Sequence, residues 1–385
     1  MSVNTTSGVR RRLLVAAAMG LLSILSTVVP SGAAVAADRA PTALSIDVSP
    51  TRLTYGTDLT ITARLTSVET GAPVPGATVQ VERKLTGSTA YGVIATLVTD
   101  ADGVVRMVHK PQVNADYAAS YDGDTGFAPS SAGPKHADVA PRLTARLSKA
   151  AARAGSHVTL SGSLTPSHPG RTVRIERYYS GAWHLVTTAT LSSTGAFSSV
   201  LTTPPPGWIK YRVVRPADRD NLAATTLLPA LDSFRLHTYI VRSRGTIVAS
   251  MSTFAATVAA TYADGRGWVR GHHRFTRVSS GGDFTVLLAE ARYVPTYSSI
   301  CSIQYSCRVG RYVIINQDRW RHGSRYFPGT LTQYRQMVIN HETGHWLGNR
   351  HAYCGGAGQL APVMQQQSKG MQGCKPNAWP LAREL

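Results

Sequence analysis

Alternating apolar and polar positions run from about residue 40 to residue 229 of the 385-residue chain. Short stretches rich in Val, Thr and Leu, such as Leu59-Thr60-Ile61, are separated by Gly, Pro and Asp. A period of two residues places one face of a strand against a core. The pattern therefore predicts short β-strands joined by regular turns over this whole region.

The strand pattern occurs twice. The segment 75–83 (PGATVQVER) is repeated at 169–177 (PGRTVRIER), about 94 residues further along, and Asp102-Gly103 corresponds to Thr194-Gly195 at a strand turn. A repeat of this size fits one immunoglobulin-like sandwich. Residues 40–139 and 140–229 are expected to form two sandwiches that resemble the Ig-like domains of bacterial surface and secreted proteins. A passive spacer and a binder of cell-wall or substrate polymer are both open roles.

The periodicity changes at about residue 231. Strand patterns occupy 237–241, 284–288 and 312–315, and a helical pattern with Phe254, Val258 and Tyr262 on one face follows Ser250, which can cap it. The order of strand, helix, several strands and a last helix predicts a mixed α and β domain over residues 231–385.

The last helical pattern is expected to carry metal ligands. Thr330 and Gln333 form a capping box at its start. His341 and His345 lie four residues apart, which places both on one face of a helix. Two imidazoles at that spacing can share one Zn²⁺ at about 2.0–2.1 Å.

Three further residues complete a catalytic pattern. Glu342, beside the first ligand, occupies the position of a general base in this kind of hydrolase. Gly348 allows the chain to leave the helix through a left-handed conformation, which brings His351 back as a third ligand. Three protein ligands leave one position for water, as in a catalytic zinc site.

The run His341–His351 (HETGHWLGNRH) resembles the metzincin zinc-peptidase signature. The likeness is tight from Asn340 to Met364, and Met364 matches the methionine turn of that family. It also resembles a poorly characterised group of secreted bacterial metzincin-like domains and the small snapalysin-type peptidases, which use Asp where this chain has His351. Ala352 replaces a polar residue of several metzincin subfamilies, and no Tyr follows Met364. The resemblance implies an α+β metzincin-like zinc peptidase domain behind two all-β sandwiches.

All four cysteines lie in the last third of the chain. An even number in an exported protein indicates disulfides, with three connectivities open. The favoured pairs are Cys301–Cys307, closing a short loop, and Cys354–Cys374, which would brace the third ligand and the Met364 turn. Zinc ligation by cysteine is the alternative.

Residues 1–36 have the pattern of a signal peptide, with three consecutive arginines, a short apolar stretch and a small-residue cleavage site at Ala34-Val35-Ala36. No later apolar run is long enough to span a membrane. The mature chain is therefore expected to be secreted and extracellular, with association to the cell wall also open.

The formal charge is +19, and the basic residues are scattered. Nucleic-acid binding calls for a concentrated basic patch with stacking aromatics, and none is evident in the sequence. Attraction to anionic cell-envelope polymers is more plausible for an exported basic protein.

These features predict a secreted zinc endopeptidase that acts on proteins or peptides. His341, His345 and His351 would hold Zn²⁺, Glu342 would act as general base, and Met364 would form an apolar floor. The remaining candidates, His237, His272, His273 and His322, fit no ligand spacing. Two alternatives stay open, a non-catalytic surface-binding protein with a zinc-bound scaffold and a zinc hydrolase of a non-peptide amide.

Overall fold

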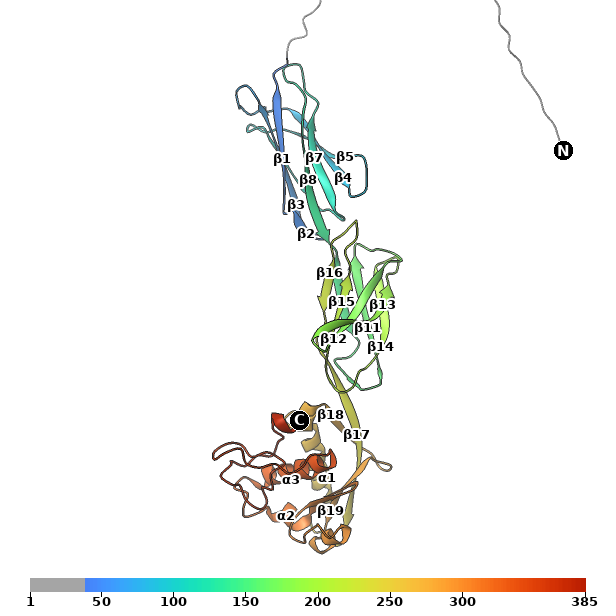
Figure 1. Cartoon of the computed structure of the whole chain (residues 1–385), viewed down its shortest axis with the longest axis vertical. Coiled ribbons are helices and arrows are strands. Elements are labelled where there is room, and N and C mark those ends of the chain that lie inside the picture. Colours follow the sequence, from blue (N-terminus) through green and yellow to red (C-terminus); the bar gives the residue numbers. More distant parts are fainter. Residues whose placement is uncertain (1–38) are drawn as a thin grey trace, which may run out of the picture.

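A computed structural model describes residues 39–385, so the signal peptide predicted for residues 1–36 lies outside the described residues. Two β-sandwiches and a helix-containing unit follow one another along the long axis of the molecule (Figure 1). Within the described part of the chain, no helix is long and apolar enough to cross a membrane.

The first sandwich has a three-stranded sheet in the order β1-β3-β6 and a five-stranded sheet in the order β2-β8-β7-β4-β5. One hydrophobic core, with Leu59, Val79 and Tyr117 at its centre, lies between the two sheets. The strands are β1 (Thr42–Ser49), β2 (Arg52–Thr54), β3 (Leu59–Ser67), β4 (Thr78–Leu85), β5 (Gly92–Val98), β6 (Val104–His109), β7 (Ala115–Tyr121) and β8 (Ser130–Ala140).

The second sandwich repeats this plan. Sheet β14-β11-β9 and the strands β13-β12-β15, extended by β16, enclose a core around Leu160, Ile175 and Tyr211. Its strands are β9 (Arg142–Leu147), β10 (Ala151–Arg153), β11 (His157–Thr165), β12 (Thr172–Tyr179), β13 (Ala182–Thr190), β14 (Ala196–Thr202), β15 (Gly207–Arg215) and β16 (Ala224–Leu227).

The repeated strand turn is present in both sandwiches. Gly103 and Gly195 have φ of +69° and +77°, a left-handed conformation that favours glycine. A Cβ at these positions would collide with the carbonyl oxygens of Leu65 and Leu164. Glycine therefore occurs at both turns for the same steric reason.

The last unit contains a sheet with three α-helices. Strands β18, β17, β19 and β21 pair in parallel, and β20 adds an antiparallel edge. The elements are β17 (Leu231–Arg244), α1 (Met251–Ala263), β18 (His273–Arg277), β19 (Phe284–Ala289), β20 (Cys307–Val309), β21 (Tyr312–Asn316), α2 (Gln317–His322) and α3 (Leu331–Trp346), with 3₁₀ turns η1 (Trp268–Gly271), η2 (Ala291–Tyr297) and η3 (Ala382–Glu384). The strands predicted at 237–241, 284–288 and 312–315 are confirmed.

The helical pattern after Ser250 is also confirmed. Ser250 accepts a hydrogen bond from the backbone N–H of Thr253 and caps α1. Phe254, Val258 and Tyr262 are buried against the sheet in the core that α1 shares with α3. This core fixes the helix on which the metal ligands were expected.

The expected fold class is wrong in its last part. The described chain is predominantly β, and it has no separate α+β metzincin-like domain behind the sandwiches. Strand β17 is 14 residues long, pairs with β15 of the second sandwich near its start and with β19 further on, and so carries one sheet through both units. Its parallel pairs also differ from the largely antiparallel sheet of an α+β domain.

Candidate metal centre

Helix α3 presents the predicted ligands, and its start follows the predicted capping box. The Thr330 hydroxyl accepts from the Gln333 backbone N–H at 3.2 Å, and the Gln333 side chain accepts from the Thr330 N–H at 2.8 Å. The helix ends at Trp346, and Gly348 has a φ of +104°. The backbone thus turns where the sequence predicted it to turn.

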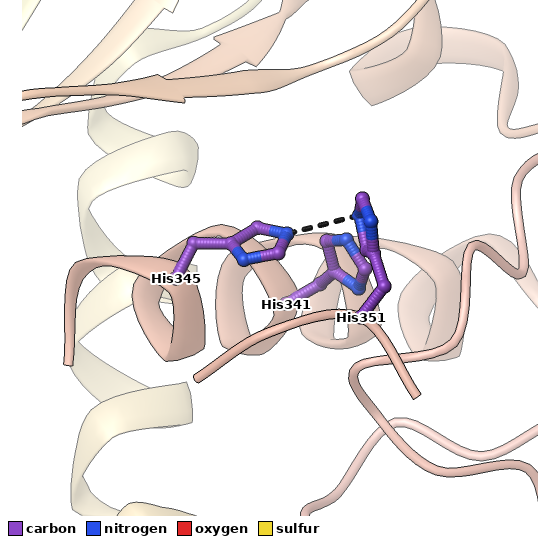
Figure 2. Close-up of side chains that lie close together, drawn as sticks. All are labelled: His341, His345 and His351. Atoms are coloured by element: carbon purple, nitrogen blue, oxygen red, sulfur yellow. Dashed lines mark hydrogen bonds between the residues drawn. The ribbon is translucent and has the colours of Figure 1, made fainter. Parts of the chain in front are cut away.

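The structure brings His341, His345 and His351 together (Figure 2), with their ligand atoms within 4.8 Å of one another. His341 Nδ1 lies 2.8 Å from the carbonyl oxygen of Val363, and His345 Nδ1 lies 2.9 Å from that of Asn349. A carbonyl oxygen only accepts, so both Nδ1 atoms carry the proton. Their Nε2 atoms are then free to bind a metal ion.

The donor set fits a zinc ion. His345 Nε2 lies 3.1 Å from His351 Nε2. Two lone pairs facing each other at this distance repel unless a cation or proton lies between them. Ligands of one tetrahedral zinc, with Zn–N of about 2.0–2.1 Å, are separated by about 3.3 Å. Among residues 39–385, these three histidines are the one cluster with metal-ligand geometry.

Burial sets the protonation states of the three histidines. Desolvation, with the nearby His345 as a smaller cause, lowers the pKa of His341 to about 3. The pKa values of His345 and His351 are also lowered, mainly by burial. Neutral imidazoles are the form that binds metal.

Glu342 is buried, with 5% of its surface exposed. Burial raises the pKa of its carboxyl to about 8, although Arg308 and Lys369 oppose the shift. A carboxyl group with a pKa in this range can both accept and release a proton near neutral pH.

Met364 lies beneath the ligand helix. It is 1% exposed and packs with Trp268 and Val363. A Cβ on Gly344, between the first two ligands, would collide with the Met364 sulfur and with the Trp268 ring. The close approach of α3 to the methionine turn (Val363 and Met364) therefore depends on the absence of a side chain at Gly344.

Glu384, near the end of the chain, holds the methionine turn. Its carboxylate accepts the backbone N–H of Val363 at 3.0 Å, of Met364 at 2.8 Å and of Leu381 at 2.7 Å. The Val363 carbonyl in turn accepts from His341. Glu384 was not identified from the sequence, because no motif marks a carboxylate that acts through backbone hydrogen bonds.

Both favoured disulfides are confirmed, Cys301–Cys307 and Cys354–Cys374. No cysteine among the described residues is free, so the alternative of cysteine as zinc ligand is wrong. The second bridge joins the segment after His351 to the chain beyond Met364. The Ala352 N–H also donates to the Met364 carbonyl at 3.1 Å.

The histidines face a cleft of about 670 Å³. Arg308, Arg350 and Lys369 line it, and among residues 39–385 Glu342 is the one acidic residue in its wall. The Arg308 guanidinium donates to the His345 carbonyl at 2.6 Å, and its Nε has no hydrogen-bond partner within the described residues. These cations were not predicted, since their spacing in the sequence shows no pattern.

The other four histidines of residues 231–385 lie outside this site. His237 and His273 stack, with their ring nitrogens 2.8 Å apart. His272 pairs with Asp232 at 2.6 Å, and His322 ends α2. The structure does not place any of these four beside His341, His345 and His351.

A family model described as "Protein of unknown function (DUF3152)" matches residues 223–381. The match starts one residue before β16 and includes β17, α1 and α3. No curated protein matches the sequence of this chain.

Three solved structures resemble the chain over about half of its length. Adhesin InvE of Yersinia pseudotuberculosis is 15% identical, with a TM-score of 0.25, over 49% of this chain and 58% of its own. A tetra-tandem repeat from the extending region of a large adhesion protein is 19% identical, with a TM-score of 0.28, over 49% of each chain. An ectodomain fragment of ICAM-5 is 16% identical, with a TM-score of 0.27, over 48% of this chain and 53% of its own. None of the three is described as a metzincin or a peptidase, and likenesses this remote carry no argument about function.

Proposed function

We propose that this protein is a zinc-dependent hydrolase that cleaves peptide bonds. The observation that carries the proposal is the convergence of three neutral imidazoles beside a buried Glu342 in an open cleft. A purely structural zinc site has no use for an acid beside its first ligand. The ligand pattern, which resembles the metzincin signature, gives separate support from the sequence.

His341, His345 and His351 would hold the ion, and the hydrogen-bonded Nδ1 atoms of His341 and His345 leave their Nε2 atoms free. A bound zinc ion supplies a Lewis acid that acidifies water and polarises a carbonyl group. Glu342 accepts a proton from the water that attacks the scissile carbonyl and then delivers it to the leaving nitrogen. The methionine turn orients His341 and takes no part in proton transfer.

An extended substrate is proposed to lie along β20. This strand is the edge of the sheet, and its residues Cys307 and Arg308 line the cleft. A free strand edge binds an extended peptide through backbone hydrogen bonds. The cations Arg308, Arg350 and Lys369 favour a peptide with acidic side chains near the cleaved bond.

The proposed site of action is outside the cytoplasm. The signal-peptide pattern of residues 1–36 and the two disulfides both support an exported protein. Cell-wall association remains part of the proposal.

The test is hydrolysis of a diverse peptide library by the zinc-loaded protein and by Glu342→Gln. The proposal predicts chelator-sensitive hydrolysis by the wild type, a loss of at least about a hundredfold in the variant, and equal zinc content in both. The matched control is Glu69→Gln, an exposed acid in the first sandwich, which should retain full activity. Stoichiometric zinc with no hydrolysis of any library member would falsify the peptidase proposal.

A further inference from the structure

One outer face of the second sandwich carries exposed aromatic rings among cations. Residues two apart on a strand share a face, so Trp208, Lys210 and Arg212 of β15 lie together on the side opposite the buried Tyr211. Lys210 pairs with Tyr178 of β12, and Tyr178 pairs with Trp183 of β13. We call the following set the aromatic-basic face: Arg174, Tyr178, Trp183, Trp208, Lys210 and Arg212.

Two rings and two cations of this face are in contact with one another. The Tyr178 and Trp183 rings meet edge to face, with centres 5.4 Å apart and planes at 62°. The Lys210 ammonium lies 5.9 Å from the centre of the Tyr178 ring, and the Arg212 guanidinium lies 4.6 Å from that of Trp183. Trp208 is 65% exposed. Large aromatic side chains exposed on a sheet are typical of binding surfaces.

The face is cationic. The carboxylate among these residues, Glu176, is 4% exposed and is paired with Arg174 at 3.1 Å and Arg212 at 2.6 Å. One carboxylate thus offsets one of three cations. The remaining charge faces solvent beside the rings.

The sandwich scaffold does not require these residues, because the first sandwich is built without them. Glu176 corresponds to Glu82 in the repeat. Arg212 lies opposite Glu176, whereas Ala118 lies opposite Glu82. At the next outward position, Lys210 of the second sandwich is replaced by Asp116 in the first. The aromatic-basic face is therefore specific to the second sandwich, and the folding of a sandwich does not explain it.

We propose that the aromatic-basic face binds an anionic polysaccharide, a polymer of sugar rings that carry carboxylate or phosphate groups. Aromatic rings provide flat apolar contact for sugar rings, and adjacent cations pair with the anionic groups. The residues extend over three adjacent strands, which suits an extended polymer. Successive bases of single-stranded nucleic acid stack on a series of roughly parallel rings, whereas the planes of Tyr178 and Trp183 meet at 62°.

The experiment measures binding of the full chain to polygalacturonate, to neutral dextran and to a single-stranded oligothymidine. The test variants are Tyr178→Ala/Lys210→Ala and Trp208→Ala, which leave the Arg212–Glu176 pair intact. We expect polygalacturonate to bind better than dextran or the oligothymidine, and each test variant to weaken that binding by about tenfold. Thermal unfolding checks that each variant is folded.

The matched control is Lys84→Ala/Tyr91→Ala, because the Lys84 ammonium lies 5.0 Å from the Tyr91 ring centre in the first sandwich. It removes the same two residue types and should leave binding unchanged. If the control variant weakens polygalacturonate binding equally, the effect comes from net charge alone and the proposal is overturned. Equal binding of dextran would remove the anionic requirement, and tighter binding of the oligothymidine would assign the face to nucleic acid.

Discussion

At the scale of single residues, the hydrogen bonds of the histidines give the candidate site its chemical character. The sequence predicted His341, His345 and His351 from their spacing alone, and the structure brings them together. It could not predict the partners of His341 and His345, the carbonyls of Val363 and Asn349, because backbone acceptors carry no residue signature. Those partners fix which nitrogen of these two rings faces the candidate metal position.

Glu342 makes the stability of the metal-free protein depend on pH. Its pKa is raised from 4.5 to about 8, so the folded protein retains a proton that the unfolded chain loses above pH 4.5. Stability from this group is therefore lost as the pH rises from 4.5 to 8. Glu342→Gln, measured by urea unfolding in chelator, should be more stable than the wild type by roughly 1–3 kcal/mol at pH 8 and equal to it near pH 4. A difference independent of pH would show that the carboxyl titrates normally.

Lys369 is expected to influence substrate choice. Its cationic side chain lines the cleft beside the candidate ligands. Lys369→Gln should reduce kcat/KM roughly two- to fivefold for peptides with Asp or Glu beside the cleaved bond. Neutral peptides should be unaffected, as should all peptides with the control variant Lys149→Gln, an exposed position of the second sandwich. The same loss for both kinds of peptide would exclude a role in selecting charge.

At the scale of elements, local sequence signals predicted α3 well. The capping box at Thr330, the exit at Gly348 and the pairing of Cys354 with Cys374 are all present. The cap and the exit depend on residues close together in the sequence, and the disulfide is one of a few possible cysteine pairings. The hydrogen bonds from the backbone of Val363 and Met364 to the Glu384 carboxylate join distant parts of the chain. They have no local signal in the sequence, and the sequence did not predict them.

Glu384 is expected to control metal affinity through the methionine turn. Its carboxylate accepts three backbone N–H groups, two of them in the turn whose carbonyl orients His341. Glu384→Gln has one acceptor oxygen fewer and should weaken zinc binding about tenfold in a competition titration with a chromogenic chelator. Glu69→Gln serves as the control. Unchanged zinc affinity together with reduced thermal stability would make Glu384 a structural residue only.

Gly344→Ala tests the close approach of α3 to Met364. In a helix interior, alanine is normally more stabilising than glycine by about 1 kcal/mol. Here the new Cβ would collide with the Met364 sulfur and the Trp268 ring. We expect a loss of about 1–3 kcal/mol in the free energy of unfolding. Gly265→Ala, where a Cβ meets no atom within 4 Å, should leave stability nearly unchanged, and a stabilised Gly344→Ala would contradict this packing.

At the scale of the whole molecule, the sequence predicted strands better than their partners. The repeat indicated two sandwiches, and the strand patterns after residue 231 were correct. Periodicity does not reveal whether strands pair in parallel, nor that β17 continues the sheet of the second sandwich. The resemblance of a short motif to the metzincin signature does not predict a complete α+β domain. The motif describes the ligands, whereas the fold depends on long-range pairing.

The most direct test of the proposed metal centre is X-ray absorption at the zinc edge of the purified full-length protein. Three imidazoles sharing one ion predict about one zinc per chain and a first shell of four nitrogen or oxygen atoms at about 2.0–2.1 Å, with outer scattering from three imidazole rings. His351→Ala should lose one imidazole, while His322→Ala should match the wild type. Sulfur atoms at about 2.3 Å, or folded protein that binds no zinc, would contradict the three-histidine site.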